Sequence, residues 1–212
     1  MDADAIYTSL IQNNSGSIVD PADCHVLACI FAIAAQEAAQ AGSLAAGLGL
    51  GGSALRRVID ECFPGSLSLL EHFGVDEPQS AGDEEASLRE LLQRFSTRGS
   101  AFSGLYSTLI ARRSMRPNHL WQDLGLIQRS ELSALMNRHF APLARRNSQD
   151  MKWKRFFYRM ICREDGFTLC AAPVCSECTD FETCFGDESG ESLLARNTLR
   201  SPGGARAQMP AL

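Results

Sequence analysis

The sequence has little positive charge, no basic N-terminal segment of the secretory type and no apolar run long enough to cross a membrane. Its 20 lysines and arginines are outnumbered by 25 acidic residues, which gives a formal net charge of −5. Nonspecific binding of nucleic acid requires a basic surface that neutralises phosphates, so this activity is not expected. The most apolar run, residues 26–35, is shorter than the ~20 residues that span a bilayer. We therefore expect a soluble, cytoplasmic protein with no nucleic-acid or membrane partner.

The signatures of common catalytic machineries are also missing. The chain has no G-x-S-x-G elbow, no P-loop and no H-E-x-x-H pair. Gly47, Gly49 and Gly52 satisfy a G-x-G-x-x-G spacing, but that fingerprint requires a preceding strand, and an alanine-rich helix is expected there instead. We interpret these glycines as part of a flexible loop between helices, and we expect no enzymatic activity.

No segment alternates apolar and polar residues convincingly with the period of two that a half-buried strand requires. Apolar residues instead recur at helical spacing in segments 55–62, 88–95, 102–110 and 132–143. Residues 22–41 are apolar nearly all round, which is typical of a buried central helix. Apolar residues are 45% of the chain, enough for a hydrophobic core. The pattern predicts an all-α, helical bundle-like single domain of about seven helices.

Composition divides the chain into three parts. Residues 1–165 are expected to form the helical body, and residues 166–186 hold a cysteine-rich segment that we predict to be a metal-cluster-binding loop. Residues 187–212 contain glycine, proline and arginine but little to bury, so we expect a disordered tail.

The cysteine-rich segment places four cysteines within fifteen residues, with the spacing C-x4-C-x2-C-x5-C: Cys170, Cys175, Cys178 and Cys184. In a reducing cytosol such density indicates metal or redox chemistry more often than structural disulfides. One loop with unequal gaps fits an iron–sulfur type cluster, whereas structural zinc usually takes two separated C-x2-C pairs. Spacing alone leaves zinc and a redox disulfide open.

An amphipathic helix with a basic stripe is predicted just before this segment. Next to anionic thiolates, the stripe can attract an oxyanion, although a solvated helix face is the alternative. Cys162 on the same helix is a candidate fifth ligand, but we favour a partly buried helical cysteine. The stripe consists of Lys152, Arg155, Arg159 and Arg163.

Two histidines have neighbours that suggest a site, and a third is assigned to packing. His119 and Asp123 lie four residues apart in a dense polar cluster, which predicts either an interhelical hydrogen-bond network or a site. His25 and Cys29 share a helix face and have a spacing suited to a metal, but we favour a hydrogen-bonded core histidine. We interpret His139 as a packed residue. The cysteines of the first third are assigned to the core: Cys24, Cys29 and Cys62.

Three stretches together resemble the NifQ family of nitrogen-fixation proteins. They are "NHLWQDLGL" at 118–126, "MKWKRFFYRMIC" at 151–162 and the cysteine spacing that follows. "HVLACIFAIAA" in the first half is also similar. The cysteine spacing behind an aromatic and basic helix makes the resemblance specific.

The resemblance implies a protein that carries a molybdenum–iron–sulfur cluster and supplies molybdenum for synthesis of the nitrogenase iron–molybdenum cofactor. It implies that the four clustered cysteines bind the cluster and that the partners are nitrogenase cofactor-assembly proteins: the scaffold and the nitrogenase iron protein. Molybdate or a molybdenum storage source would supply the metal. His119 receives no role from the resemblance. Read from the residues alone, an iron–sulfur electron-transfer protein and a zinc-stabilised interaction module remain alternatives.

Overall fold

The backbone of the protein is helical throughout its described part. The computed structural model describes residues 2–14, 19–68, 77–78, 82–164, 181–188, 190 and 194. Within these residues the chain forms eleven helices and no strand, so the predicted all-α fold class is confirmed.

The helices fall into a long class and a short class. Seven helices have ten or more residues: α1 (Ala3–Gln12), α2 (Pro21–Ala41), α4 (Gly52–Cys62), α6 (Asp83–Arg94), α7 (Ser103–Ser114), α9 (Arg129–His139) and α11 (Trp153–Glu164). Four have only four or five residues: α3 (Leu44–Leu48), α8 (Leu120–Asp123), α10 (Ala141–Ala144) and α12 (Phe181–Phe185). The expectation of about seven missed these four, because a single turn is too short to display an apolar periodicity.

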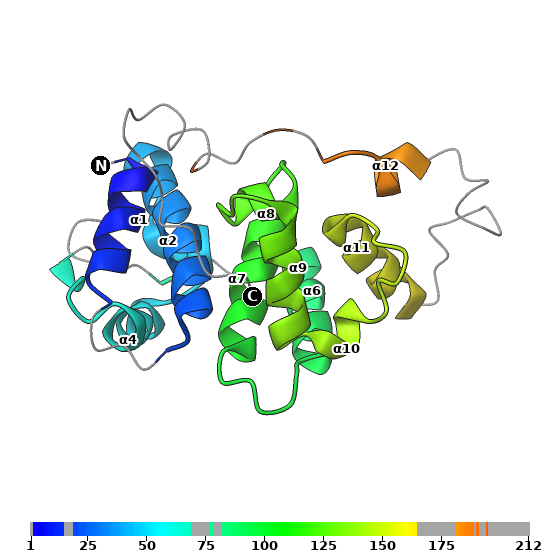
Figure 1. Cartoon of the computed structure of the whole chain (residues 1–212), viewed down its shortest axis with the longest axis horizontal. Helices are drawn as coiled ribbons and strands as arrows, with labels where there is room; N and C mark the ends of the chain where they lie inside the picture. The colour runs from blue at the N-terminus through cyan, green and yellow to red at the C-terminus, as the bar shows by residue number, and fades with distance from the viewer. Residues whose placement is uncertain are drawn as a thin grey trace.

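Helix α2 is buried along most of its length. Asp20 caps its first turn by accepting a hydrogen bond of 2.8 Å from the Ala22 amide, and Pro21 occupies a position where no amide hydrogen is needed. Residues 27–34 are at most 3% exposed, as predicted for a helix that is apolar all round. Figure 1 shows α1 and α4 on one side of α2 and the group α7, α8 and α9 on the other.

By length and composition alone, the Pro21–Gln40 stretch of α2 could cross a membrane. The expectation that no such stretch exists rested on the shorter run 26–35, and the helix extends beyond that run in both directions. However, 72% of its apolar window is buried inside the protein, which is typical of the core helix of a soluble protein. The packing therefore favours a core role for α2.

The glycine-rich segment after α2 differs from the flexible loop that was expected. Helix α3 forms there because the Ser43 side chain accepts a hydrogen bond of 3.1 Å from the Ala46 amide. Gly49 ends the helix in the left-handed conformation with φ +68°, which glycine adopts without strain. The loop prediction is wrong for these residues, because serine and glycine caps make a helical turn of a segment that composition alone describes as a loop.

One hydrophobic core joins the helices from α1 to α11. The core also includes Leu194, which is fully buried and lies in the part of the chain expected to be a tail. Glu188, in the same part, has a side chain only 7% exposed. The remaining residues of the expected tail lie outside the described residues, apart from Asp187 and Gly190.

A buried arginine ties the middle of the molecule to α2. Arg113 on α7 is 1% exposed and donates two hydrogen bonds of 2.8 Å to the carboxylate of Glu37 on α2. Its Nε donates a third bond, of 2.7 Å, to the carbonyl oxygen of Asp123 at the end of α8. Because a guanidinium offers donors in a fixed planar fork, one side chain holds three helices in register.

Candidate functional site

The described part of the chain contains one cysteine of the predicted cluster set. Cys184 lies on α12, is partly buried and packs against the core cluster. The described residues contain no group of three or more histidine, cysteine or acidic side chains that could hold a metal ion. The ligand set therefore stays a prediction, since its other members lie outside the described residues: Cys170, Cys175 and Cys178.

The backbone around Cys184 is held by the first residue of the basic stripe. The Lys152 amide donates a hydrogen bond of 2.9 Å to the Cys184 carbonyl oxygen, and Lys152 Nζ donates one of 3.2 Å to the Glu182 carbonyl. Figure 1 shows α12 close to the start of α11. Lys152 itself precedes α11, and its carbonyl accepts the Phe156 amide at 2.9 Å. The turn that starts α11 is thus also the anchor of the cysteine-bearing segment.

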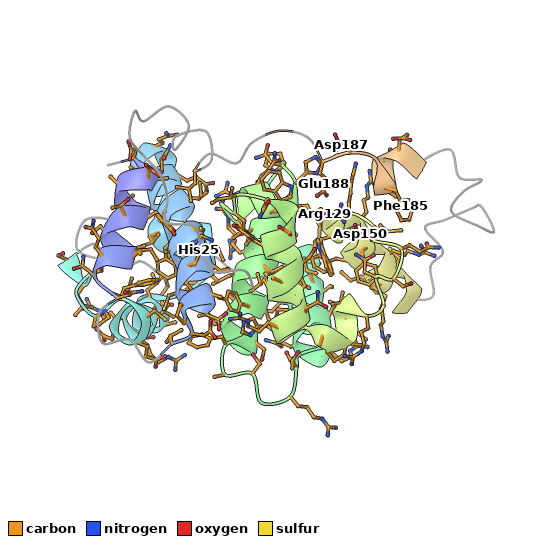
Figure 2. All side chains as sticks on the ribbon, viewed as in Figure 1. His25, Arg129, Asp150, Phe185, Asp187 and Glu188 are labelled. Atoms are coloured by element: carbon orange, nitrogen blue, oxygen red, sulfur yellow. The ribbon has the colours of Figure 1, made fainter. Side chains whose placement is uncertain are left out.

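Four residues after Cys184, Glu188 contacts two helices of the body. Its Oε1 lies 3.5 Å from Nδ1 of His119, and its Oε2 lies 3.6 Å from Nη1 of Arg129. Arg129 also donates a hydrogen bond of 2.8 Å to the carboxylate of Asp150. It therefore links the segment around Asp150 to the segment around Glu188, and Figure 2 shows these residues close together. The sequence predicted either a hydrogen-bond network or a site around His119. Its imidazole faces the segment that carries Cys184.

The side chains of His119 and Asp123 have different partners, although the Asp123 amide donates a hydrogen bond of 2.9 Å to the His119 carbonyl. The carboxylate of Asp123 accepts hydrogen bonds from Asn118 Nδ2 at 3.1 Å and from Lys154 Nζ at 2.5 Å. Burial lowers the pKa of Lys154, while the contact with Asp123 opposes that shift. Most of this polar cluster is thus an interhelical network between α8 and α11, and His119 alone of the pair points to the cysteine segment.

Gly125 lets the turn after α8 approach α2. It has φ +72°, and a Cβ on it would lie 2.8 Å from the carbonyl oxygen of Cys29. Any other residue would therefore clash with the α2 backbone. This close approach explains the glycine in the "NHLWQDLGL" stretch and fixes the position of His119 relative to the core.

The rest of the basic stripe lies along α11. Arg155 is exposed and Arg159 is half-buried, while the side chain of Arg163 lies outside the described residues. Cys162 on the same helix is half-buried, and no described metal-ligand group includes it. The opposite face of α11 is buried and aromatic, as its periodicity predicted: Trp153, Phe156, Phe157 and Met160.

His25 sits in a hydrogen-bonded setting, as favoured from the sequence. Its Nδ1 lies 2.8 Å from the hydroxyl of Tyr7, and its Nε2 lies 3.6 Å from the carboxylate of Glu131. The Sγ of Cys29 lies 3.8 Å from the same Nε2 and is fully buried. These groups cross-link α1, α2 and α9.

A second histidine network was missed by sequence reasoning. His139 is buried, as predicted, but both of its ring nitrogens are engaged: Nε2 with Asp23 at 2.7 Å and Nδ1 with the hydroxyl of Ser100 at 2.7 Å. The Tyr106 hydroxyl donates to Asp23 at 3.2 Å. Asp23, Ser100 and His139 line part of a hollow of about 860 Å³. Asp23 is 116 residues from His139, so no local pattern signals the pair.

The chain is similar to known proteins over most of its length. The NifQ family model matches residues 26–186. The protein is 42% identical to a NifQ homolog of Sinorhizobium fredii over 80% of this chain and 74% of that protein. It is 38% identical to the NifQ protein of Rhodobacter capsulatus over 71% of this chain and 82% of that one. No solved structure matches.

The matched region spans all four clustered cysteines, His119, Cys162 and the basic stripe, so it includes every residue of the candidate site. The chain belongs to the NifQ family, whose members take part in nitrogen fixation.

Proposed function

We propose that this protein binds a molybdenum–iron–sulfur cluster through Cys170, Cys175, Cys178 and Cys184 and supplies molybdenum for synthesis of the nitrogenase iron–molybdenum cofactor. The observation that carries the proposal is the family match over residues 26–186, which contains the complete cysteine set. The chemistry of the donors supports it, because soft thiolates suit iron–sulfur centres and reduced molybdenum. The cluster is cargo in this proposal, and the protein acts as a carrier rather than as an enzyme.

The anchoring of the segment suits a carrier. Lys152 and Glu188 hold the chain at and just after Cys184, against α11, α8 and α9. In this proposal the core does not depend on the metal, so the cluster can be loaded and released without unfolding the body. A metal that must leave needs ligands near the surface, and Cys184 is only partly buried.

The partners in this proposal are the scaffold and iron protein of cofactor assembly, with molybdate or a molybdenum storage source as supply. Arg155 is exposed on α11, so it is placed to meet an acidic partner surface. Replacing the stripe residues with glutamine should then slow either loading or delivery of molybdenum while leaving iron in place. The set is Lys152, Arg155, Arg159 and Arg163.

The test is analysis of metal and acid-labile sulfide in protein purified without oxygen. Molybdenum together with iron and sulfide supports the carrier function. Iron and sulfide without molybdenum would make the protein an iron–sulfur electron-transfer protein instead. Zinc without sulfide would make it a zinc-stabilised interaction module. Transfer of labelled molybdenum to cofactor-assembly proteins lacking the metal then separates a donor from a storage protein.

A further inference from the structure

A basic hollow lies beside α11. It measures about 680 Å³ and is bounded by the connection between α10 and α11 and by α11 itself. Three arginines line it: Arg145, Arg146 and Arg159. Asn147 and Ser148 add uncharged polar groups, and the described residues that line it include no aspartate or glutamate.

Two of these arginines differ from the ion-paired arginines of the body. Arg113, Arg116 and Arg129 each pair with a carboxylate at 2.8 to 2.9 Å. Within the described residues, no ion pair is formed by Arg145 or Arg146, and both are exposed. The protein has a net charge of −5, so carboxylates are abundant, yet Arg145 and Arg146 are left without an ion pair within the described residues. Two such arginines facing one hollow form a local anion-attracting site.

Local contacts fix the conformation of the connection between α10 and α11, which carries Arg145 and Arg146. Asn147 Oδ1 accepts a hydrogen bond of 2.9 Å from the Met151 amide, and Asn147 Nδ2 donates one of 2.8 Å to the Met151 carbonyl. The guanidinium of Arg146 stacks over the Phe95 ring, 4.3 Å from its centroid. Because the turn and one arginine are already fixed, binding an anion there requires little further ordering.

The hollow is next to the anchor of the cysteine segment. Met151 lines it, and the next residue, Lys152, donates its amide to the Cys184 carbonyl. We infer that the hollow is a binding site for a small tetrahedral oxyanion dianion, which arginine guanidiniums bind through paired hydrogen bonds. If the proposed function holds, the physiological occupant is molybdate, captured close to the anchor of Cys184. Sulfate and phosphate share this chemistry and are the competing occupants.

The test measures equilibrium binding of labelled molybdate to the full-length protein, with sulfate and phosphate as competitors. The hollow variant is Arg145→Gln/Arg146→Gln. The matched control is Arg56→Gln/Arg57→Gln, another pair of adjacent exposed arginines, on α4, with the same change in charge. The dissociation constant should rise about tenfold or more in the hollow variant, because two charge-assisted contacts are lost, and stay unchanged in the control. Wild-type affinity should fall as ionic strength rises.

Absence of molybdate binding by the wild type, or an equal loss in both variants, would overturn the inference. Equal displacement by sulfate supports a general oxyanion site, and selectivity for molybdate supports the supply role. Circular dichroism establishes that both variants are folded. Iron, sulfide and molybdenum analysis of the same preparations keeps the two proposals apart. Cluster without oxyanion binding contradicts only this inference, and oxyanion binding without molybdenum in the cluster contradicts only the proposed function.

Discussion

The helical body and the cysteine-bearing segment are held by contacts of different quality. In the body, Arg113 binds Glu37 at 2.8 Å, and His139 lies 2.7 Å from Asp23, all within a continuous core. In the segment, Glu188 lies 3.5 and 3.6 Å from its two partners, and its Oε2 accepts no hydrogen bond within the described residues. The body therefore supplies most of the stability of the fold, whereas residues 181–188 are held on it by the hydrogen bonds from Lys152 and by the longer contacts of Glu188.

The largest effect is expected from the loss of a predicted cluster ligand. Changing Cys170, Cys175, Cys178 or Cys184 to alanine should remove or severely deplete the bound cluster and leave the helical body folded, because the four ligands are confined to fifteen residues of the sequence. Metal and sulfide analysis with far-ultraviolet circular dichroism measures both parts. Collapse of the fold in each variant would instead identify a structural site of the zinc type.

The matched control uses the three core cysteines: Cys24, Cys29 and Cys62. All are at most 1% exposed, and burial raises the pKa of the Cys62 thiol to about 12, so it stays protonated at neutral pH. Replacing all three with alanine or valine should leave metal content unchanged and cost roughly 1–2 kcal/mol of stability per site. Loss of molybdenum in this variant would place a second site on α2.

The next largest effect should be a loss of stability of the helical body. Arg113→Met removes the buried guanidinium, which takes two hydrogen bonds from the Glu37 carboxylate and one from the Asp123 carbonyl and leaves Glu37 paired only with Arg116, so unfolding free energy should fall by about 3 kcal/mol. Metal content per folded molecule should not change. Denaturant unfolding measures the first quantity and metal analysis the second. An Arg56→Met control on the exposed face of α4 should change stability by no more than about 0.5 kcal/mol.

The stability of Arg113→Met should also depend on pH differently from that of the wild type. Burial raises the pKa of Glu37, but Arg113 and Arg116 outweigh that effect and hold it below its ordinary value of 4.5. A carboxyl whose folded pKa is depressed stabilises the fold above its unfolded pKa, and this stability is lost as pH falls through the folded pKa. Wild-type stability should thus decline below about pH 4.5 more steeply than that of Arg113→Met. Parallel curves would mean that the ion pair contributes nothing.

The smallest effect is expected at the contact between the two regions. Glu188→Gln removes the charge that faces His119 and Arg129, so amide hydrogen exchange in 181–188 should accelerate by a few-fold while the body is unchanged. Asp187→Asn makes the same charge change at an exposed neighbouring residue and is the control. Figure 2 labels both residues. Equal exchange rates in the two variants would show that Glu188 does not hold the segment.

Much of the fold could be predicted because its signals are local. Apolar residues recur along α4, α6, α7, α9 and α11 at the spacing of one helix face, and those faces are buried. The short helix α3 was missed because its capping residues, Ser43 and Gly49, also occur in loops. The cysteine spacing and the aromatic and basic helix before it were sufficient to identify the family, since both are continuous in sequence.

The contacts of the site could not be predicted in the same way, because charged side chains choose partners in space. His119 lies four residues from Asp123 in the sequence, but its side chain faces Glu188. The Asp123 carboxylate binds Lys154 of another helix. His139 finds Asp23 at a sequence distance of 116 residues. Pairing of this kind depends on which helices lie side by side, and periodicity carries no information about that arrangement.

Residue order alone therefore specified the helical class, the buried faces and the position of the four thiols along the chain, because each depends on spacing within one segment. Tertiary structure decided the rest. It brought Lys152 to the backbone of Cys184 and Glu188 to His119, and it gathered Arg145, Arg146 and Arg159 around one hollow. The physical reason is that ion pairs and hollows form between elements whose relative positions are set by packing of the whole core.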